Sequence, residues 1–247
     1  MARNDFTPRR LYVEAQLSTG GRVELNAAQA HYLRNVLRLS DGAEIPVFNG
    51  RDGEWRARLS ASSRHPELIA LAQIRPQEPG ADLHYLFAPL KHARQDYMVQ
   101  KAVEMGASLL QPVLTRHTQA ERVNLERMRA NAIEAAEQCG LLTVPEIAAP
   151  RKLDLILAGW PEERLLVFCD EAMDGGNPVA ELQKVKAEPR PLALLIGPEG
   201  GFDAAERAAI LAGPCVLRLS LGPRILRADT AAVAALALVQ AILGDWR

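Results

Sequence analysis

Two loops rich in glycine and proline carry the residue types best suited to enclose a small molecule. The first, residues 194–203, reads LLIGPEGGFD, so an apolar run leads into Gly-Pro-Glu-Gly-Gly and ends on Asp203, a candidate helix cap. Glycines let the backbone approach a ligand closely, and a helix that starts after the loop offers free N–H groups. A tight strand-to-helix connection without a ligand fits the same spacing. The chain contains neither GxGxxG nor GxxxxGK[ST], which disfavours a phosphate cradle.

The second loop, residues 219–230, reads LSLGPRILRADT and repeats the pattern of an apolar run that ends in Gly-Pro. Arg224, Arg227 and Asp229 cluster where an alanine-rich helix is expected to begin. Asp229 is a candidate N-cap, worth about 1 kcal/mol, and the two arginines also fit a solvated surface. Two such loops after two strands of one sheet predict one shared pocket wall.

The elements that must position these loops alternate between strands and helices. This alternation predicts a mostly parallel sheet covered by helices, and ligands of such sheets bind beyond the carboxyl ends of the strands. The apolar runs predict strands at 83–88, 109–114, 165–169, 192–196 and 216–221, with helices at 94–105, 125–139, 204–211 and 230–243.

The amino-terminal part has a different pattern, with short alternating segments at 22–25 and 54–59 and turn pairs such as Asn49-Gly50. This spacing predicts a small β-barrel or β-sandwich. One helix over 26–39, with Asn26 as its N-cap, is expected to interrupt it. The predicted organisation is therefore a β domain at 1–75, a proline-containing linker at 76–82 and an α/β domain at 83–247.

The charge balance excludes a general nucleic-acid coat, because 30 acidic residues face 29 basic ones and the formal net charge is −1. An RNA ligand would need a local basic patch. Arg34 and Arg38 are four positions apart on the predicted helix, and with Arg9 and Arg10 they form a candidate phosphate-binding patch. A solvated helix face is the alternative.

Cysteine usage and hydropathy indicate a reduced, cytoplasmic compartment. Cys139, Cys169 and Cys215 form no CxxC pair, so neither a metal site nor a disulfide framework is predicted. Residues 1–6 contain no apolar leader segment. The most apolar stretch, 231–239, is far shorter than the ~20 residues that span a bilayer, so no membrane contact is expected.

Several segments together resemble one known family. The specific ones are LLIGPEGGF at 194–202 and LSLGPRILRADTA at 219–231, and the supporting ones are DYMVQKAVEMG at 96–106, EAAEQCG at 134–140 and HYLRNVLRL at 31–39. Over nearly its whole length the sequence resembles the bacterial 16S rRNA uridine-N3 methyltransferases of the SPOUT, or trefoil-knot, superfamily.

The resemblance implies a knotted carboxyl-terminal methyltransferase domain that forms a homodimer, and a PUA-like amino-terminal domain that grips RNA. It implies S-adenosylmethionine as the methyl donor and 16S rRNA as the partner. Local arginines on a chain of near-zero net charge suit a structured ribonucleoprotein better than naked RNA, so the rRNA is expected to be recognised within the small ribosomal subunit. Another SPOUT enzyme, acting on tRNA or a ribose 2′-OH, and a non-catalytic ribosome assembly factor are the alternatives. The residues implied to hold the donor are Asp170, Ile196, Gly197, Glu199, Gly200, Gly201, Leu219, Leu221, Gly222, Ile225 and Leu226.

Methylation of uridine N3 requires removal of its proton and stabilisation of the resulting anion. Arg224 and Arg227 are the candidates for stabilising the anion or holding a phosphate, while Glu199 or Asp229 accepts the proton or plays a structural part. The histidines are expected to be non-catalytic. Two positions depart from the family pattern: many members carry Glu at the position of Asp229 and Arg at that of Leu141.

Overall fold

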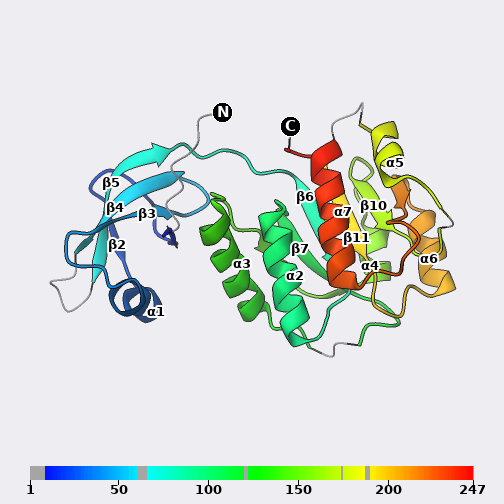
Figure 1. Cartoon of the computed structure of the whole chain (residues 1–247), viewed down its shortest axis with the longest axis horizontal. Coiled ribbons are helices and arrows are strands. Elements are labelled where there is room, and N and C mark those ends of the chain that lie inside the picture. The colour runs from blue at the N-terminus through cyan, green and yellow to red at the C-terminus, as the bar shows by residue number, and fades with distance from the viewer. Residues whose placement is uncertain (1–8, 61–65, 120–121, 174, 187–189, 247) are drawn as a thin grey trace. The chain divides into compact units, whose positions relative to one another are not determined.

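The computed structural model describes residues 9–60, 66–119, 122–173, 175–186 and 190–246, which divide into two compact units (Figure 1). The first unit comprises Met1–Pro79 and Ala136–Val144, and the second comprises Gly80–Ala135 and Pro145–Arg247. The division after Pro79 falls within the predicted linker. Residues 1–6, where no leader is expected, lie outside the described residues.

The first unit is built on a curled five-stranded sheet in the order β1-β3-β4-β5-β2. β1 runs parallel to β3 and the other neighbours are antiparallel. Irregular register between β4 and β5 adds local twist. Ala57 and Leu59 of β4 are buried and Arg56 and Arg58 are exposed, as the alternating sequence predicts, but Glu54 is also buried. The strands are β1 (Leu11–Tyr12), β2 (Arg22–Glu24), β3 (Glu44–Phe48), β4 (Glu54–Ser60) and β5 (Glu67–Arg75).

The predicted helix of this unit begins where expected but ends early. Asn26 caps α1 (Ala27–His31) in a capping box with Gln29, which confirms the predicted N-cap. A π-helical turn, η1 (Tyr32–Val36), follows and directs Leu33 into the core. Arg38 then takes a left-handed φ of 53°. The prediction of one helix to residue 39 is therefore wrong, and Arg38 does not share a helix face with Arg34, although both side chains are exposed.

Arg10 is not part of a phosphate-binding patch, and that prediction is corrected here. Arg10 is only 3% exposed, and its guanidinium forms an ion pair with the buried carboxylate of Glu54. It also donates to the carbonyl oxygens of Ala136 at 3.0 Å and Leu141 at 2.8 Å. The guanidinium thus satisfies carbonyls at the end of a helix and in the turn that follows. Arg9, the adjacent residue, is exposed.

The second unit confirms the predicted α/β class. Its sheet has the order β12-β10-β11-β6-β7-β8, β9 pairs with β7, and every described pair is parallel. All of β11 is buried, as expected for a parallel strand covered on both faces. The strands are β6 (Leu83–Phe87), β7 (Leu109–Leu114), β8 (Glu146–Ile147), β9 (Arg151–Lys152), β10 (Leu165–Cys169), β11 (Leu192–Ile196) and β12 (Val216–Leu219).

The helices of this unit cover the sheet, and α7 lies beside α2 (Figure 1). The limits predicted for α3 and α6 match the structure, whereas the short helices α4 and α5 were not predicted. Buried residues of α7, including Ala228, Ala232, Leu236 and Val239, recur at helical spacing. The helices are α2 (His92–Glu104), α3 (Leu125–Cys139), α4 (Leu153–Ala158), α5 (Pro178–Lys184), α6 (Ala204–Leu211) and α7 (Ala228–Ile242).

The described residues contain neither a helix suited to span a membrane nor a cluster of metal-binding side chains. None of the helices in that part of the chain has the length and apolar character needed to cross a membrane. Within the same residues, no group of three or more His, Cys, Asp or Glu side chains could hold a metal ion.

Candidate active site

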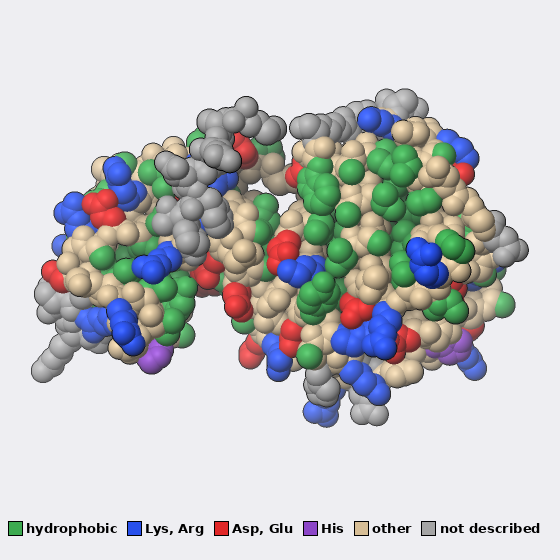
Figure 2. Space-filling model, in the orientation of Figure 1, with side chains coloured by type: hydrophobic (Ala, Val, Ile, Leu, Met, Phe, Trp, Pro, Cys, Tyr) green, Lys and Arg blue, Asp and Glu red, His purple; other side chains and the backbone are tan. Residues whose placement is uncertain are grey.

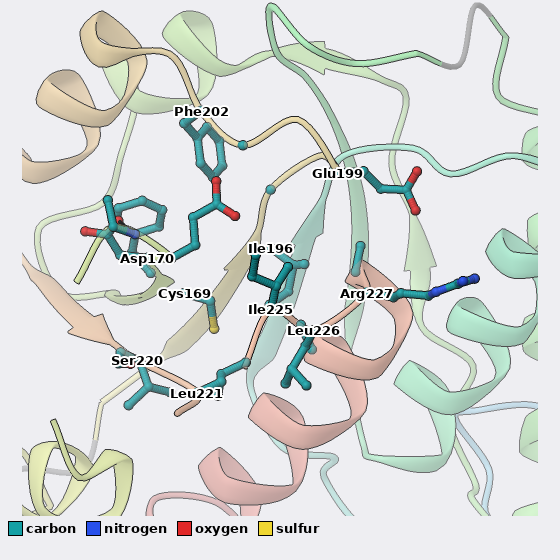
Figure 3. Close-up of a pocket in the computed structure, with 18 of the residues that line it drawn as sticks. Cys169, Asp170, Ile196, Glu199, Phe202, Ser220, Leu221, Ile225, Leu226 and Arg227 are labelled. Carbon is teal, nitrogen blue, oxygen red and sulfur yellow. Dashed lines mark hydrogen bonds between the residues drawn. The ribbon is translucent and has the colours of Figure 1, made fainter. Parts of the chain in front are cut away.

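The parallel register brings the ends of three strands to one edge of the sheet. Cys169 at the end of β10 lies opposite Leu219 at the end of β12, and Phe168 lies opposite Leu195 of β11. The loops that leave these strands therefore meet. They enclose a pocket of about 340 Å³ (Figure 3). Both Gly-Pro loops line this pocket, as predicted from the sequence.

Most residues predicted for the site line this pocket. Gly200 and Asp229 are absent from its lining. Additional lining residues that the sequence did not single out include Cys169, Phe202, Arg207 and Ser220. The predicted residues that do line the pocket are Asp170, Ile196, Gly197, Glu199, Gly201, Leu219, Leu221, Gly222, Arg224, Ile225, Leu226 and Arg227.

The loop after β11 is shaped by close contacts that require glycine. A Cβ atom on Gly197 would lie 2.5 Å from Cε2 of Phe202, so a larger residue would displace that ring. Asp203 accepts from the backbone N–H of Glu206 and caps α6, as predicted. The Glu206 carboxylate also accepts from the backbone N–H of Arg116 at 2.7 Å. These bonds fix where the loop ends and the helix begins.

The loop after β12 presents free cations and one fully exposed apolar side chain. Gly222 has a φ of 100°, a conformation that favours glycine. Arg224 and Arg227 are exposed and make no ion pair among the described residues. Arg227 is also the N-cap residue of α7. Ile225 is 97% exposed, so this loop meets solvent rather than the protein interior.

Asp170 lies at the pocket but its carboxylate is already engaged. The residue is 4% exposed, Arg207 forms a fork to it, and Arg218 donates to it at 2.9 Å. Burial by itself would raise the pKa of Asp170, but the bonds from Arg207 and Arg218 outweigh it and the pKa is lowered. The carboxylate therefore joins α6 and β12 to the loop after β10.

Replacing Asp170 with asparagine is expected to lower the free energy of unfolding by roughly 1.5–3 kcal/mol at neutral pH. Because the folded pKa of Asp170 lies below its unfolded value, this stability is present above about pH 4 and is lost as the pH falls through the folded pKa. Urea unfolding at several pH values measures it. The deficit should shrink in acid. Exposed Asp154→Asn is the control, and a pH-independent deficit would contradict the assignment.

Arg94, which the sequence analysis did not single out, holds two of the predicted catalytic residues. Its Nε and Nη2 donate to the two oxygens of Asp229 at 3.0 and 3.2 Å, and its Nη1 donates to Glu199. Asp229 lies in the first turn of α7 and accepts from the N–H of Thr230. It is not the N-cap, so that prediction is wrong. The position of Arg94 after β6, at the same sheet edge, is the signal that could have revealed it.

Two groups near the pocket, the half-buried Cys169 and the buried Tyr85, stay protonated. Burial raises the pKa of the Cys169 thiol to about 12, so the thiol behaves as an apolar part of the lining rather than as a nucleophile. Burial also raises the pKa of the Tyr85 phenol, with further contributions from Cys169 and Asp229. Its hydroxyl lies 3.0 Å from the sulfur of Met98. Acid–base chemistry at this pocket therefore falls to the carboxylates.

Comparisons with known proteins agree with this architecture. The family model for an RNA methyltransferase domain matches residues 76–240, and that for an RNA methyltransferase PUA domain matches residues 25–71. The ribosomal RNA small subunit methyltransferase E of Rickettsia conorii is 29% identical over 96% of each chain. The enzyme of that name from Synechocystis is 32% identical over 95% of this chain and 78% of its own.

A solved structure of an enzyme with this name has a similar fold. The ribosomal RNA small subunit methyltransferase E from Neisseria gonorrhoeae, bound to S-adenosyl methionine, superposes with a TM-score of 0.85 at 27% identity. The match covers 98% of this chain and 100% of that one.

The parallel-sheet α/β fold and the pocket lined by its two Gly-Pro loops define the class as SPOUT-type RNA methyltransferases. The chain belongs to the ribosomal RNA small subunit methyltransferase E family. The predicted fold class, with its PUA-like amino-terminal domain, and the predicted family are both confirmed.

Proposed function

We propose that this chain transfers a methyl group from S-adenosylmethionine to N3 of a uridine in 16S rRNA. The observation that carries the proposal is the pocket at the carboxyl edge of the sheet, with Glu199 and Arg227 together on one side of it (Figure 3). A donor held in the pocket would face an exposed carboxylate and an exposed cation, the two charges that deprotonation and anion stabilisation require.

The pocket suits the proposed donor in size and chemistry. About 340 Å³ lies within the usual range for small-molecule sites. Apolar side chains of Ile196, Leu221 and Leu226 offer contacts for an adenine ring, while the backbone at Gly222, where an added Cβ would meet nothing within 4 Å, is open to close approach. The sulfonium of S-adenosylmethionine supplies the electrophilic methyl group, so the residues of this chain need to orient the target base and manage its proton.

Glu199 is the better proton acceptor of the two candidates. Asp229 is 17% exposed and both of its oxygens accept from Arg94, which is the largest cause of its lowered pKa. A lowered pKa makes a carboxylate a weaker base. Glu199 accepts a single bond from Arg94, is 47% exposed and lines the pocket. In the proposed mechanism, Glu199 takes the N3 proton and Asp229 supports Arg94.

Two sets of exposed arginines are proposed to act on the RNA. Arg224 and Arg227 would stabilise the uridine anion at its carbonyl oxygens or bind a phosphate next to the target. Arg9, Arg34 and Arg38 remain exposed in the first unit and are the proposed phosphate contacts there. Arg10 is withdrawn from that set because it is buried.

The proposal is tested by incubating the protein with labelled S-adenosylmethionine and small ribosomal subunits that lack this modification, then identifying the methylated nucleoside by mass spectrometry. We expect 3-methyluridine in 16S rRNA, and a loss of about 10²-fold in kcat for Arg227→Ala because a charge-stabilising donor is removed. Arg22→Ala, which removes an exposed arginine of β2, is the matched control.

The other outcomes separate the competing functions. A different methylated nucleoside, in tRNA or at a ribose 2′-OH, would overturn the target and keep the chemistry. Failure to bind the donor would favour a non-catalytic assembly factor. Free 16S rRNA assayed in parallel tests the proposed preference for the assembled subunit, and equal rates on both substrates would contradict that preference.

A homodimer through the second unit is part of the proposal. Ile225 is almost completely exposed on the loop that lines the pocket, and Tyr97 of α2 is 47% exposed. Hydrophobic side chains also gather over α7 on the face of this unit that Figure 2 shows. Burying such side chains against a second copy would remove apolar surface from water. Sedimentation equilibrium of the full chain should show a dimer, and a monomer at micromolar concentration would contradict this part.

A further inference from the structure

Arg94 joins the two segments that carry the proposed catalytic carboxylates. Glu199 belongs to the loop after β11 and Asp229 to the first turn of α7, and both accept from the same guanidinium on α2. Arg94 is not among the residues that line the large pocket, but lines a smaller cavity on the other side of Pro198 and Glu199. Arg94 therefore contacts the two carboxylates from outside the large pocket.

We infer that Arg94 is a positioning residue that sets the place of Glu199, with Asp229 as its anchor. The inference rests on the proposed function, in which Glu199 takes the proton from uridine N3. Arg94 acts through Glu199 and does not touch the methyl donor.

The direction of this support follows from an asymmetry in the three contacts. Asp229 accepts from two guanidinium nitrogens, a fork that fixes both partners in orientation. Glu199 accepts from one nitrogen and is the most exposed of the three side chains, at 47% against 31% for Arg94 and 17% for Asp229. Asp229, the less exposed carboxylate, is thus held in a fixed orientation by Arg94. Glu199, the more exposed one, keeps one carboxylate oxygen for the substrate.

Arg94 also supplies the cation that two carboxylates share. Without its guanidinium, Glu199 and Asp229 would both lose this partner. The bonds from Arg94 are the largest cause of the lowered pKa of Asp229. Other titratable groups nearby are Lys91 and His117, which line the small cavity, the exposed Arg227, which lies on the same side of the large pocket as Glu199, and the buried Tyr85.

The inference is tested with Arg94→Gln and Arg94→Lys, assayed for kcat against pH, for donor affinity by calorimetry and for melting temperature. Arg94→Gln should lower kcat by about tenfold to a hundredfold, because the base is misplaced, while the donor Kd changes less than about threefold. Arg94→Lys should recover part of the loss in kcat.

The control is Arg127→Gln. Arg127 forms a comparable fork to Asp96, and it lines neither cavity. Its removal should leave kcat, the pH profile and the donor Kd unchanged. The fork that it breaks is exposed, so it also reports the effect on the melting temperature of losing one surface ion pair on α2.

A double variant tests the anchor. If Arg94 acts with Asp229 as one unit, Arg94→Gln should have much less effect on kcat in an Asp229→Asn background than in the wild-type chain. Fully additive losses would overturn the anchor. Unchanged kcat in Arg94→Gln would overturn the inference, as would a loss of donor affinity that accounts for the whole loss of activity.

The failure of this inference is distinguishable from the failure of the proposed function. A wild-type chain that methylates another nucleoside overturns the proposed target, and the same kcat and pH measurements on that RNA then decide the role of Arg94. A wild-type chain that binds the donor but methylates no RNA overturns both.

Discussion

Replacing Glu199 with glutamine is expected to lower kcat for uridine methylation by about 10²- to 10⁴-fold, the usual contribution of a general base. The amide keeps the size of the side chain and can still accept from Arg94, so the geometry of the loop should survive. The donor affinity, measured by calorimetry, should stay close to that of the wild-type chain. The loss therefore reports the missing basic oxygen rather than a damaged pocket.

The deficit of Glu199→Gln should narrow at alkaline pH, where a larger fraction of the uridine is already deprotonated. Rapid-quench measurement of a single turnover across the pH range tests this. Glu181→Gln, on the surface of α5 beside Lys184, makes the same chemical change away from the pocket and is the control. A larger loss for Asp229→Asn than for Glu199→Gln would instead make Asp229 the base.

Replacing Arg10 with methionine is expected to lower the free energy of unfolding of the first unit by about 3–5 kcal/mol. The substitution leaves the carboxylate of Glu54 buried, with Arg75, at 3.5 Å, as its one remaining ion-pair partner among the described residues. It also removes donors from the carbonyls of Ala136 and Leu141 and the guanidinium from the face of Phe48. Methionine fills much of the same volume, so the effect is mainly one of charge and hydrogen bonding.

Urea unfolding followed by circular dichroism, with hydrogen exchange of the β3–β5 amides, measures this loss. The matched control is Arg22→Met, because Arg22 pairs with Glu67 while 71% exposed, and an exposed pair contributes less than about 1 kcal/mol. Adding Glu54→Gln to Arg10→Met should restore part of the stability by removing the buried charge. Equal losses for Arg10→Met and Arg22→Met would contradict a special role for the buried pair.

The sequence alone determined the family, the α/β class and the position of most elements of the second unit. Apolar periodicity and helix caps are local signals, so the predicted limits of β7, β10, β11, α3 and α6 match the structure. The two Gly-Pro loops were recognisable for the same reason. The N-terminal helix was predicted too long because its apolar spacing continues past residue 31, where the α-helix gives way to the π-helical turn that holds Leu33 in the core.

Only the tertiary structure decided which charged side chains are free. Arg94 and Asp229 are 135 positions apart, and Arg10 and Leu141 are 131 apart. No local pattern distinguishes a buried, paired arginine such as Arg10 from an exposed one such as Arg9. Partners are set by how strands and helices pack across such separations, and the desolvation of each charge depends on that packing. The structure therefore revealed the contact between Arg94 and Glu199 and removed Arg10 from the RNA-binding set. The two Gly-Pro loops that form the pocket, by contrast, could be recognised in the sequence.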